Sequence, residues 1–538
     1  MKFKYICLLA FSIGLISCND DDRILPEETI LPELTSGSVD FSNYVAIGAS
    51  FTAGFTDGGL FIASQENSFP NILSKEFTKV GGGNFVQPLM SDNTGGILVG
   101  GNIARSYRLT FNSETATPQP LNTFLTELGA PVPTITTEAG INIGSDFNNF
   151  GIPGAKSFHL IAPGYAGFNP YYARIASAPA ATVLGDAMAK NPTFFTLSEV
   201  GGNDVLGNAL SGGESDMMAS NYDPITPVGN FDNALNQLID GLTSNGAKGV
   251  ITNVPNITDL PHFTTVPFKP LSPLNPAFGP QIPTLNTIFG ALNGIFDAID
   301  PSRRIEFSET EASPVVIFDE TLVNISAQIK GALNNSLTFP AFVQSFGLPE
   351  AAAPLVANLL GDAYGQSRQA TEDDLLVLPS SAIIGTLNQS SLQNLIAAGL
   401  PPQLAGQFSA EGITLPLEDK WVLIPSEQDE IRVATDAYNV IIKSITDTND
   451  NIALVDLNNI LGELTSTGIN FDSFNLNTDL VTGGAVSLDG FHLTARGYAL
   501  MANKFLEAID DKFGTNFIVS GNVAKANDYP TNYSPLLQ

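Results

Sequence analysis

Short apolar segments alternate with amphipathic stretches along this chain. Five apolar segments, each running into Gly, Asn or Pro, predict β-strands at residues 44–48, about 147–151, 193–198, 248–253 and 452–456. Between residues 426 and 446, and again after residue 497, apolar side chains recur at steps of three and four, which indicates helices with one buried face. Strands alternating with such helices predict an α/β fold whose parallel sheet is covered on both faces. We expect ligands to bind beyond the carboxyl ends of its strands.

The starts of the two predicted helices carry side chains that can accept hydrogen bonds from backbone N–H groups. Ser426 and Asp429 have the spacing of a capping box, and Thr494 precedes the apolar stripe that begins at Tyr498. We therefore expect Ser426 and Thr494 to cap these helices.

Two long insertions, at about 80–146 and 257–425, interrupt this pattern. The larger one holds 17 of the 35 prolines, so it cannot consist of a few long uninterrupted helices. It carries one clean helical stripe from Leu285 to Ile299. This stripe fits either a helix packed in its own subdomain or an apolar lid or acyl-chain groove beside a site. We expect both insertions to decorate a single catalytic domain at residues 43–515, followed by a tail at 516–538.

The N-terminal segment has the pattern of a secretory signal. Lys2 and Lys4 precede an apolar run that is shorter than the roughly 20 residues of a membrane-spanning helix. The run ends in Leu-Ile-Ser-Cys18, which resembles a bacterial lipobox; a plain signal peptide before an incidental cysteine is the alternative. We therefore expect a signal peptide at 1–17, a lipid on Cys18 and a flexible tether at 18–42. Such a protein is anchored to the bacterial outer membrane and faces the periplasm or the cell surface.

Composition narrows the chemistry. A net charge of −31 makes nucleic acid an improbable partner, because phosphate binding requires clustered Lys and Arg. The two cysteines, Cys7 and Cys18, lie in or next to the signal, so we expect neither a disulfide nor a thiol nucleophile. With three histidines in the whole chain, a His-rich catalytic metal site is not expected. Asp447 and Asp450 lack the spacing of a calcium loop, and no cofactor or metal is predicted.

Three residues have the pattern of a Ser-His-Asp hydrolase. Ser50 follows the first strand on a turn flanked by Gly48 and Gly54, and near the other end of the chain Asp489 precedes His492 by three residues. A serine hydroxyl needs a neighbouring base, and a carboxylate can fix the tautomer of that base and favour its charged form. Alone, each motif also fits an ordinary strand-to-helix loop or a helix cap.

Two further loops offer hydrogen-bond donors for an oxyanion. Asn149-Phe-Gly-Ile-Pro-Gly154 ends the second strand, and Val200-Gly-Gly-Asn203-Asp ends the third. The N–H of Gly154 and the amide of Asn203 can complete an oxyanion hole with the N–H of Ser50.

These four blocks, in this order, resemble those of the SGNH (GDSL-like) hydrolase family. The resemblance implies Ser50 as nucleophile, Gly154 and Asn203 as oxyanion donors, Asp489 as the orienting acid and His492 as general base. It also implies a three-layer α/β/α sandwich with a five-stranded parallel sheet in the flavodoxin-like order 2-1-3-4-5. One position departs from the pattern, because Ala49 stands where the family has an aspartate before the serine.

The function expected from this set is hydrolysis of carboxylic esters through an acyl-enzyme, on a lipid or on an acylated glycan. The alternatives are a carbohydrate O-acetyl esterase, and a surface lipoprotein that keeps the fold for binding after losing turnover.

Overall fold

A five-stranded parallel sheet forms the centre of the domain that the sequence predicts to be catalytic, which is called the catalytic domain after that prediction. The computed structural model describes residues 31–115, 117–214 and 217–537, so the predicted signal peptide and Cys18 lie outside the described residues. Across the sheet the strands lie in the order β6-β1-β7-β8-β13, all parallel. Counted along the chain within this sheet alone, this order is 2-1-3-4-5; strands of the insertions account for the gaps in the numbering. The strands are β1 (Tyr44–Gly48), β6 (Asn149–Gly151), β7 (Phe194–Ser198), β8 (Lys248–Thr252) and β13 (Ile452–Val455).

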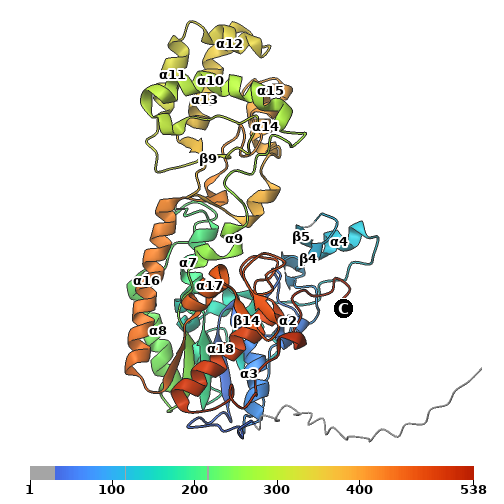
Figure 1. The fold of residues 1–538 in the computed structure, drawn as a ribbon, viewed down its shortest axis with the longest axis vertical. Helices are drawn as coiled ribbons and strands as arrows, with labels where there is room; N and C mark the ends of the chain where they lie inside the picture. The colour runs from blue at the N-terminus through green and yellow to red at the C-terminus, as the bar shows by residue number, and fades with distance from the viewer. Residues whose placement is uncertain (1–30, 116, 215–216, 538) are drawn as a thin grey trace, which may run out of the picture.

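Helices cover both faces of this sheet, which confirms the predicted α/β/α class (Figure 1). Val45 and Ile47 of β1 share one apolar core with α8 (Val228–Thr243) and α16 (Pro425–Thr448). Tyr44 and Ala46, which point the opposite way, share a second core with α3 (Phe69–Thr78) and α18 (Ala495–Phe513). The remaining helices of this domain are α1 (Ser50–Ala53), α2 (Ile62–Glu66), α5 (Pro170–Ala173), α6 (Val183–Met188), α7 (Gly202–Leu210) and α17 (Leu457–Ser466), and a hairpin joins β14 (Ile469–Phe471) to β15 (Phe474–Leu476).

One of the two predicted helix caps is correct. The Thr494 hydroxyl accepts a hydrogen bond from the N–H of Gly497 at 2.9 Å. Ser426 is not a cap, because α16 begins earlier, with Pro425 in its first turn, and the carboxylate of Glu427 accepts the N–H of Ile424 at 2.8 Å. Proline lacks an N–H, so it favours this first position and shifts the helix start.

The segment expected to be a tether is partly fixed to the domain. The N–H of Thr35 donates to the Asn516 side chain at 2.8 Å, and the ring of Phe41 is buried and stacks on Phe77 with centroids 4.2 Å apart. The expectation of a flexible segment up to residue 42 is therefore wrong for its last part. The C-terminal tail is fixed as well, since Phe517 is fully buried.

The two insertions differ in size and in how they are built. The smaller one forms two hairpins and a helix beside the sheet, namely β2 (Ile97–Val99), β3 (Asn102–Arg105), β4 (Leu109–Asn112), β5 (Thr117–Pro120) and α4 (Leu121–Glu127). The larger one stands above the catalytic domain (Figure 1). It has a hydrophobic core of its own and therefore forms a subdomain. Its elements are α9 (Pro261–Thr264), α10 (Ile282–Ile299), β9 (Val316–Phe318), α11 (Ser326–Asn335), α12 (Phe339–Ser345), α13 (Ala353–Tyr364), β10 (Ser367–Gln369), β11 (Leu375–Leu376), α14 (Gln389–Ala397), α15 (Pro402–Gln407) and β12 (Val422–Leu423).

The apolar stripe predicted between Leu285 and Ile299 lies on α10. Phe289, Leu292 and Phe296 of this stripe are buried in the core of the larger insertion. This matches the interpretation of a helix packed in its own subdomain. Only the beginning of the helix, at Leu285, also reaches the cavity described next.

Candidate active site

The five predicted site residues line one cavity at the carboxyl ends of the central strands. Ser50 begins α1 directly after β1, Gly154 follows β6, and Asn203 lies in the first turn of α7 after β7. Asp489 and His492 reach the same cavity from the loop before α18. The sequence thus selects residues that the fold brings together from four separate segments; their catalytic roles remain predictions.

Asp489 and His492 form a hydrogen-bonded pair. The Nδ1 atom of His492 lies 2.8 Å from Oδ2 of Asp489. The other carboxylate oxygen accepts the backbone N–H groups of Phe491 and His492 and the Ser487 hydroxyl, at 2.9–3.0 Å, and Gly58 donates its N–H to Oδ2 at 2.7 Å. Burial alone would raise the pKa of the Asp489 carboxyl, but the adjacent imidazole and these donors hold the pKa well below its usual range. Asp489 is therefore an ionised acceptor fixed against Nδ1 of His492, which leaves Nε2 as the ring atom for the predicted role of general base.

The imidazole of His492 lies against the turn that carries Ser50. The centroid of its ring is 4.6 Å from that of Phe55 and 5.8 Å from that of Phe51. Phe51 follows Ser50 in the short helical turn, and Phe55 comes directly after Gly54, which ends the turn with a left-handed φ of 86°. The side chain of Ser68 and the backbone of Ser64 lie within 3 Å of where a Cβ would stand, so only glycine fits there.

A buried carboxylate, Glu199, organises the Ser50 turn, and sequence analysis missed it. Its Oε1 atom accepts the N–H groups of Ala49 and Thr52 at 2.7 and 2.9 Å, and its Oε2 atom accepts that of Phe51 at 2.7 Å. Burial raises the pKa of Glu199 to about 7, against the opposing effect of these three donors. The residue directly follows β7 and has a left-handed φ of 55°, which is uncommon for a side chain of this size.

Glu199 explains how the turn tolerates Ala49. A carboxylate from the neighbouring strand end already takes the N–H groups around Ser50, so this turn does not depend on an acidic side chain at position 49. The signal for it was a glutamate placed between an apolar strand and Val200-Gly-Gly, where a buried charge is costly unless it has partners.

The residues that carry the predicted oxyanion donors line the same cavity. Among the residues that the structure describes, no acceptor takes the N–H of Ser50 or that of Gly154, although Glu199 takes those on both sides of Ser50. Gly154 has a left-handed φ of 80°, with open space where a Cβ would stand. The amide of Asn203 donates to the Ala155 carbonyl at 3.0 Å, and its second N–H remains available to a substrate.

The two other histidines have structural contacts. His262 of α9 lines the cavity, where its ring stacks on Phe491 with centroids 4.0 Å apart. The backbone N–H of His262 donates to the Gly490 carbonyl at 3.2 Å. Burial lowers the pKa of His262 to about 4, so the ring is neutral. His159 stacks on Tyr165 at 4.4 Å, away from the residues that line the cavity.

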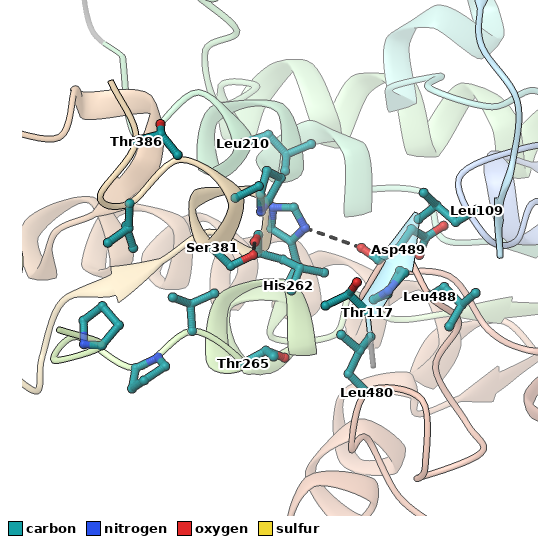
Figure 2. A pocket seen from close by; sticks show the side chains of 18 of the residues that line it. Leu109, Thr117, Leu210, His262, Thr265, Ser381, Thr386, Leu480, Leu488 and Asp489 are labelled. Atoms are coloured by element: carbon teal, nitrogen blue, oxygen red, sulfur yellow. Dashed lines mark hydrogen bonds between the residues drawn. The ribbon is translucent and has the colours of Figure 1, made fainter. Parts of the chain in front are cut away.

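Both insertions contribute walls to the cavity, whose volume is about 1280 Å³. Figure 2 shows Thr265, Ser381 and Thr386 of the larger insertion on one side, and Leu109, Leu488 and Asp489 on the other. Apolar side chains of the larger insertion extend it away from Ser50; they include Val266, Leu271, Phe278, Leu285, Ile384 and Ile413. Among the described lining residues, Arg105 is the only Lys or Arg and Asp489 the only acid. In a chain of net charge −31, this is a nearly uncharged, apolar chamber.

Comparison with known proteins adds no family to this picture. No protein-family model matches the sequence, and no curated protein matches it either. Among the described residues, no helix combines the length and the apolar composition that a membrane crossing requires.

Proposed function

We propose that this protein is a serine hydrolase of the SGNH type, acting on carboxylic esters that carry a large apolar group. The observation that carries the proposal is that one cavity is lined by Ser50, by the Asp489–His492 pair and by two backbone N–H groups that have no acceptor among the described residues. No cofactor is needed for this chemistry.

In the proposed reaction the Ser50 hydroxyl attacks the ester carbonyl while Nε2 of His492 takes its proton. Asp489 holds the imidazole through Nδ1 and stabilises its charged form. The N–H groups of Ser50 and Gly154 and the amide of Asn203 bind the oxyanion, and each such donor typically stabilises the transition state by about 3 kcal/mol. His492 then protonates the leaving alcohol. A water molecule, deprotonated by the same imidazole, hydrolyses the acyl-enzyme and releases the acid.

The cavity favours an acyl lipid over an acetylated glycan as substrate. Ligand pockets commonly measure about 300–1,000 Å³, and sugar-binding surfaces present many polar groups. The chamber beyond Ser50 exceeds that range and is lined mostly by aliphatic and aromatic side chains. Its substrate therefore carries a long or bulky apolar chain. A lipid on Cys18 would hold the protein at the outer membrane, on the periplasmic or the outer face, next to such esters.

Hydrolysis of aryl esters of rising acyl length tests this function. We expect the full chain to prefer medium and long chains over acetate, and Ser50→Ala to lose both turnover and labelling by a fluorophosphonate probe. A sharp preference for acetate would favour the glycan esterase instead. Absence of Ser50-dependent labelling would refute the hydrolase and favour a binding lipoprotein.

A further inference from the structure

Three carboxylates meet where the larger insertion rejoins the catalytic domain. Glu320 follows β9, Asp419 begins the short 3₁₀ turn Asp419–Trp421, and Glu427 lies in the first turn of α16. One oxygen of each lies within 4.8 Å of the other two. Figure 1 shows α16 descending from this junction along the catalytic domain.

The catalytic domain closes this cluster from below. After α7, Gly212 and Gly213 both have left-handed φ angles, and a Cβ on Gly213 would lie 2.1 Å from Oε1 of Glu427. A Cβ on Gly212 would lie 2.0 Å from the Asp419 carbonyl oxygen. The two glycines therefore let the backbone after α7 approach the carboxyl group of Glu427 on α16 and the backbone of the insertion at Asp419.

These carboxylates have no cationic partner among the residues that the structure describes. The neighbouring Lys420 pairs with Glu418, and Arg368 pairs with Asp319 and Asp374. Burial, followed by the neighbouring negative charges, raises the pKa of both Asp419 and Glu427.

Glu427 supplies an independent observation. Its side chain is only 6% exposed, and its Oε2 atom accepts the N–H of Ile424. Its Oε1 atom is buried without any donor in the described part of the chain, and its carboxyl group lies next to that of Glu320, whose proximity helps to raise its pKa. A buried acceptor left unpaired is costly and calls for a partner.

We propose that Glu320, Asp419 and Glu427 bind a calcium ion that fastens the larger insertion to the catalytic domain. Carboxylate oxygens without His or Cys select a hard divalent cation, and Ca²⁺ accepts six to eight oxygen ligands in flexible geometry, completed by water. Mg²⁺ demands near-ideal octahedral geometry and gives up its water reluctantly, so it binds more weakly here. This site is independent of the ester hydrolase proposal.

The single tryptophan of the chain provides a direct readout. Trp421 lies two residues after Asp419 and packs against the cores of both the catalytic domain and the insertion. Terbium, which replaces Ca²⁺ at oxygen sites, emits when a nearby excited tryptophan transfers energy to it. We expect the full chain, freed of metal with EDTA, to show sensitised emission on adding Tb³⁺ and to lose it on adding Ca²⁺. Ca²⁺ should also raise the Tm.

Matched variants separate this site from a general acidic surface. Glu427→Gln and the exposed Glu320→Gln should weaken Tb³⁺ binding by about tenfold or more, the range seen when a metal site loses a supporting group. Asp447→Asn, which changes an exposed acid on the same helix, should leave it unchanged. In EDTA, Glu320→Gln should melt at or above wild type, because one repulsive charge is gone. Equal emission from all variants, no emission, or a Ca²⁺-independent loss of Tm in Glu320→Gln would overturn the proposal; the last result would indicate a shared proton.

Discussion

Replacing Glu199 by Gln perturbs the Ser50 turn without changing any of the proposed catalytic residues. The wild-type carboxylate accepts three N–H groups at 2.7–2.9 Å. A glutamine amide has one oxygen, which can keep Ala49 and Thr52, and one NH₂ group, which then faces the N–H of Phe51. Donor faces donor at that position, so at least one buried N–H is left without an acceptor.

The size of the effect follows from that count. A buried unsatisfied donor costs about 1–3 kcal/mol, and the two remaining bonds weaken because their acceptor is no longer charged. We therefore expect Glu199→Gln to lower the free energy of unfolding by about 2–4 kcal/mol. If the displaced turn also misaligns the N–H of Ser50, the loss of one oxyanion donor lowers kcat by about 10²–10³.

Steady-state kinetics and denaturant unfolding measure the two effects separately. A positioning role predicts a lower kcat with KM nearly unchanged, because the apolar chamber that binds the substrate is intact. The control is Glu76→Gln, a glutamate of α3 that is also mostly buried and pairs with Lys79. The reasoning fails if Glu199→Gln keeps wild-type kcat, or if the control loses kcat by the same factor.

Four further predictions follow from the same geometry. Ala49→Asp should destabilise the protein, since it places a second carboxyl in a turn that is 3% exposed at Ala49, and adding Glu199→Gln should reduce the loss in a double-mutant cycle. Asp489→Asn should lower kcat by about 10⁴ while near-native thermal stability shows that the fold survives. Ala382→Trp, in the cavity wall, should move the preferred acyl length toward shorter esters in the aryl ester assay. The pKa of Glu199 is raised from 4.5 to about 7 in the folded state, so the folded protein holds this proton more tightly than the unfolded chain does. The resulting stabilisation is full below pH 4.5 and is lost as the pH rises through 7. A plot of the free energy of unfolding against pH should therefore lack this decrease in Glu199→Gln.

The strands could be predicted from sequence because buried parallel strands are continuous apolar runs that end in Gly, Asn or Pro. All five predicted strands exist within about two residues of their expected ends, as expected for such boundaries. The start of α16 could not be predicted in the same way, because Pro425 and Ser426 both favour a helix start. Which of them begins the helix depends on where β12 ends, and that follows from strand pairing. Residues 35 to 42 were predicted to be flexible because Phe41 has no periodic apolar neighbours in the sequence. Its packing partner, Phe77, comes next to it only in the folded domain.

The partners of Glu199 could not be predicted from its local sequence, because they depend on the register between two strands that are far apart along the chain. β1 and β7 pair so that Gly48 lies opposite Ser198, and this register places the next residue of each strand, Ala49 and Glu199, side by side. A shift of one residue would turn the carboxylate to the other face of the sheet. Local motifs in the sequence identify Ser50 and the proposed base His492, but the carboxylate that shapes the Ser50 turn is placed there by sheet pairing.

The larger insertion contacts the loop of the proposed base as well as lining the proposed substrate cavity. At its beginning, His262 donates its N–H to Gly490 and stacks on Phe491, within the loop that holds Asp489 and His492. Gly490 has a φ of 79°, and a Cβ there would lie 2.8 Å from the His262 nitrogen, so the two segments are in direct backbone contact. A displacement of the insertion at this point therefore also displaces the orienting carboxylate. It follows that substitutions which loosen this contact lower kcat, whereas substitutions in the distant cavity wall change the choice of ester.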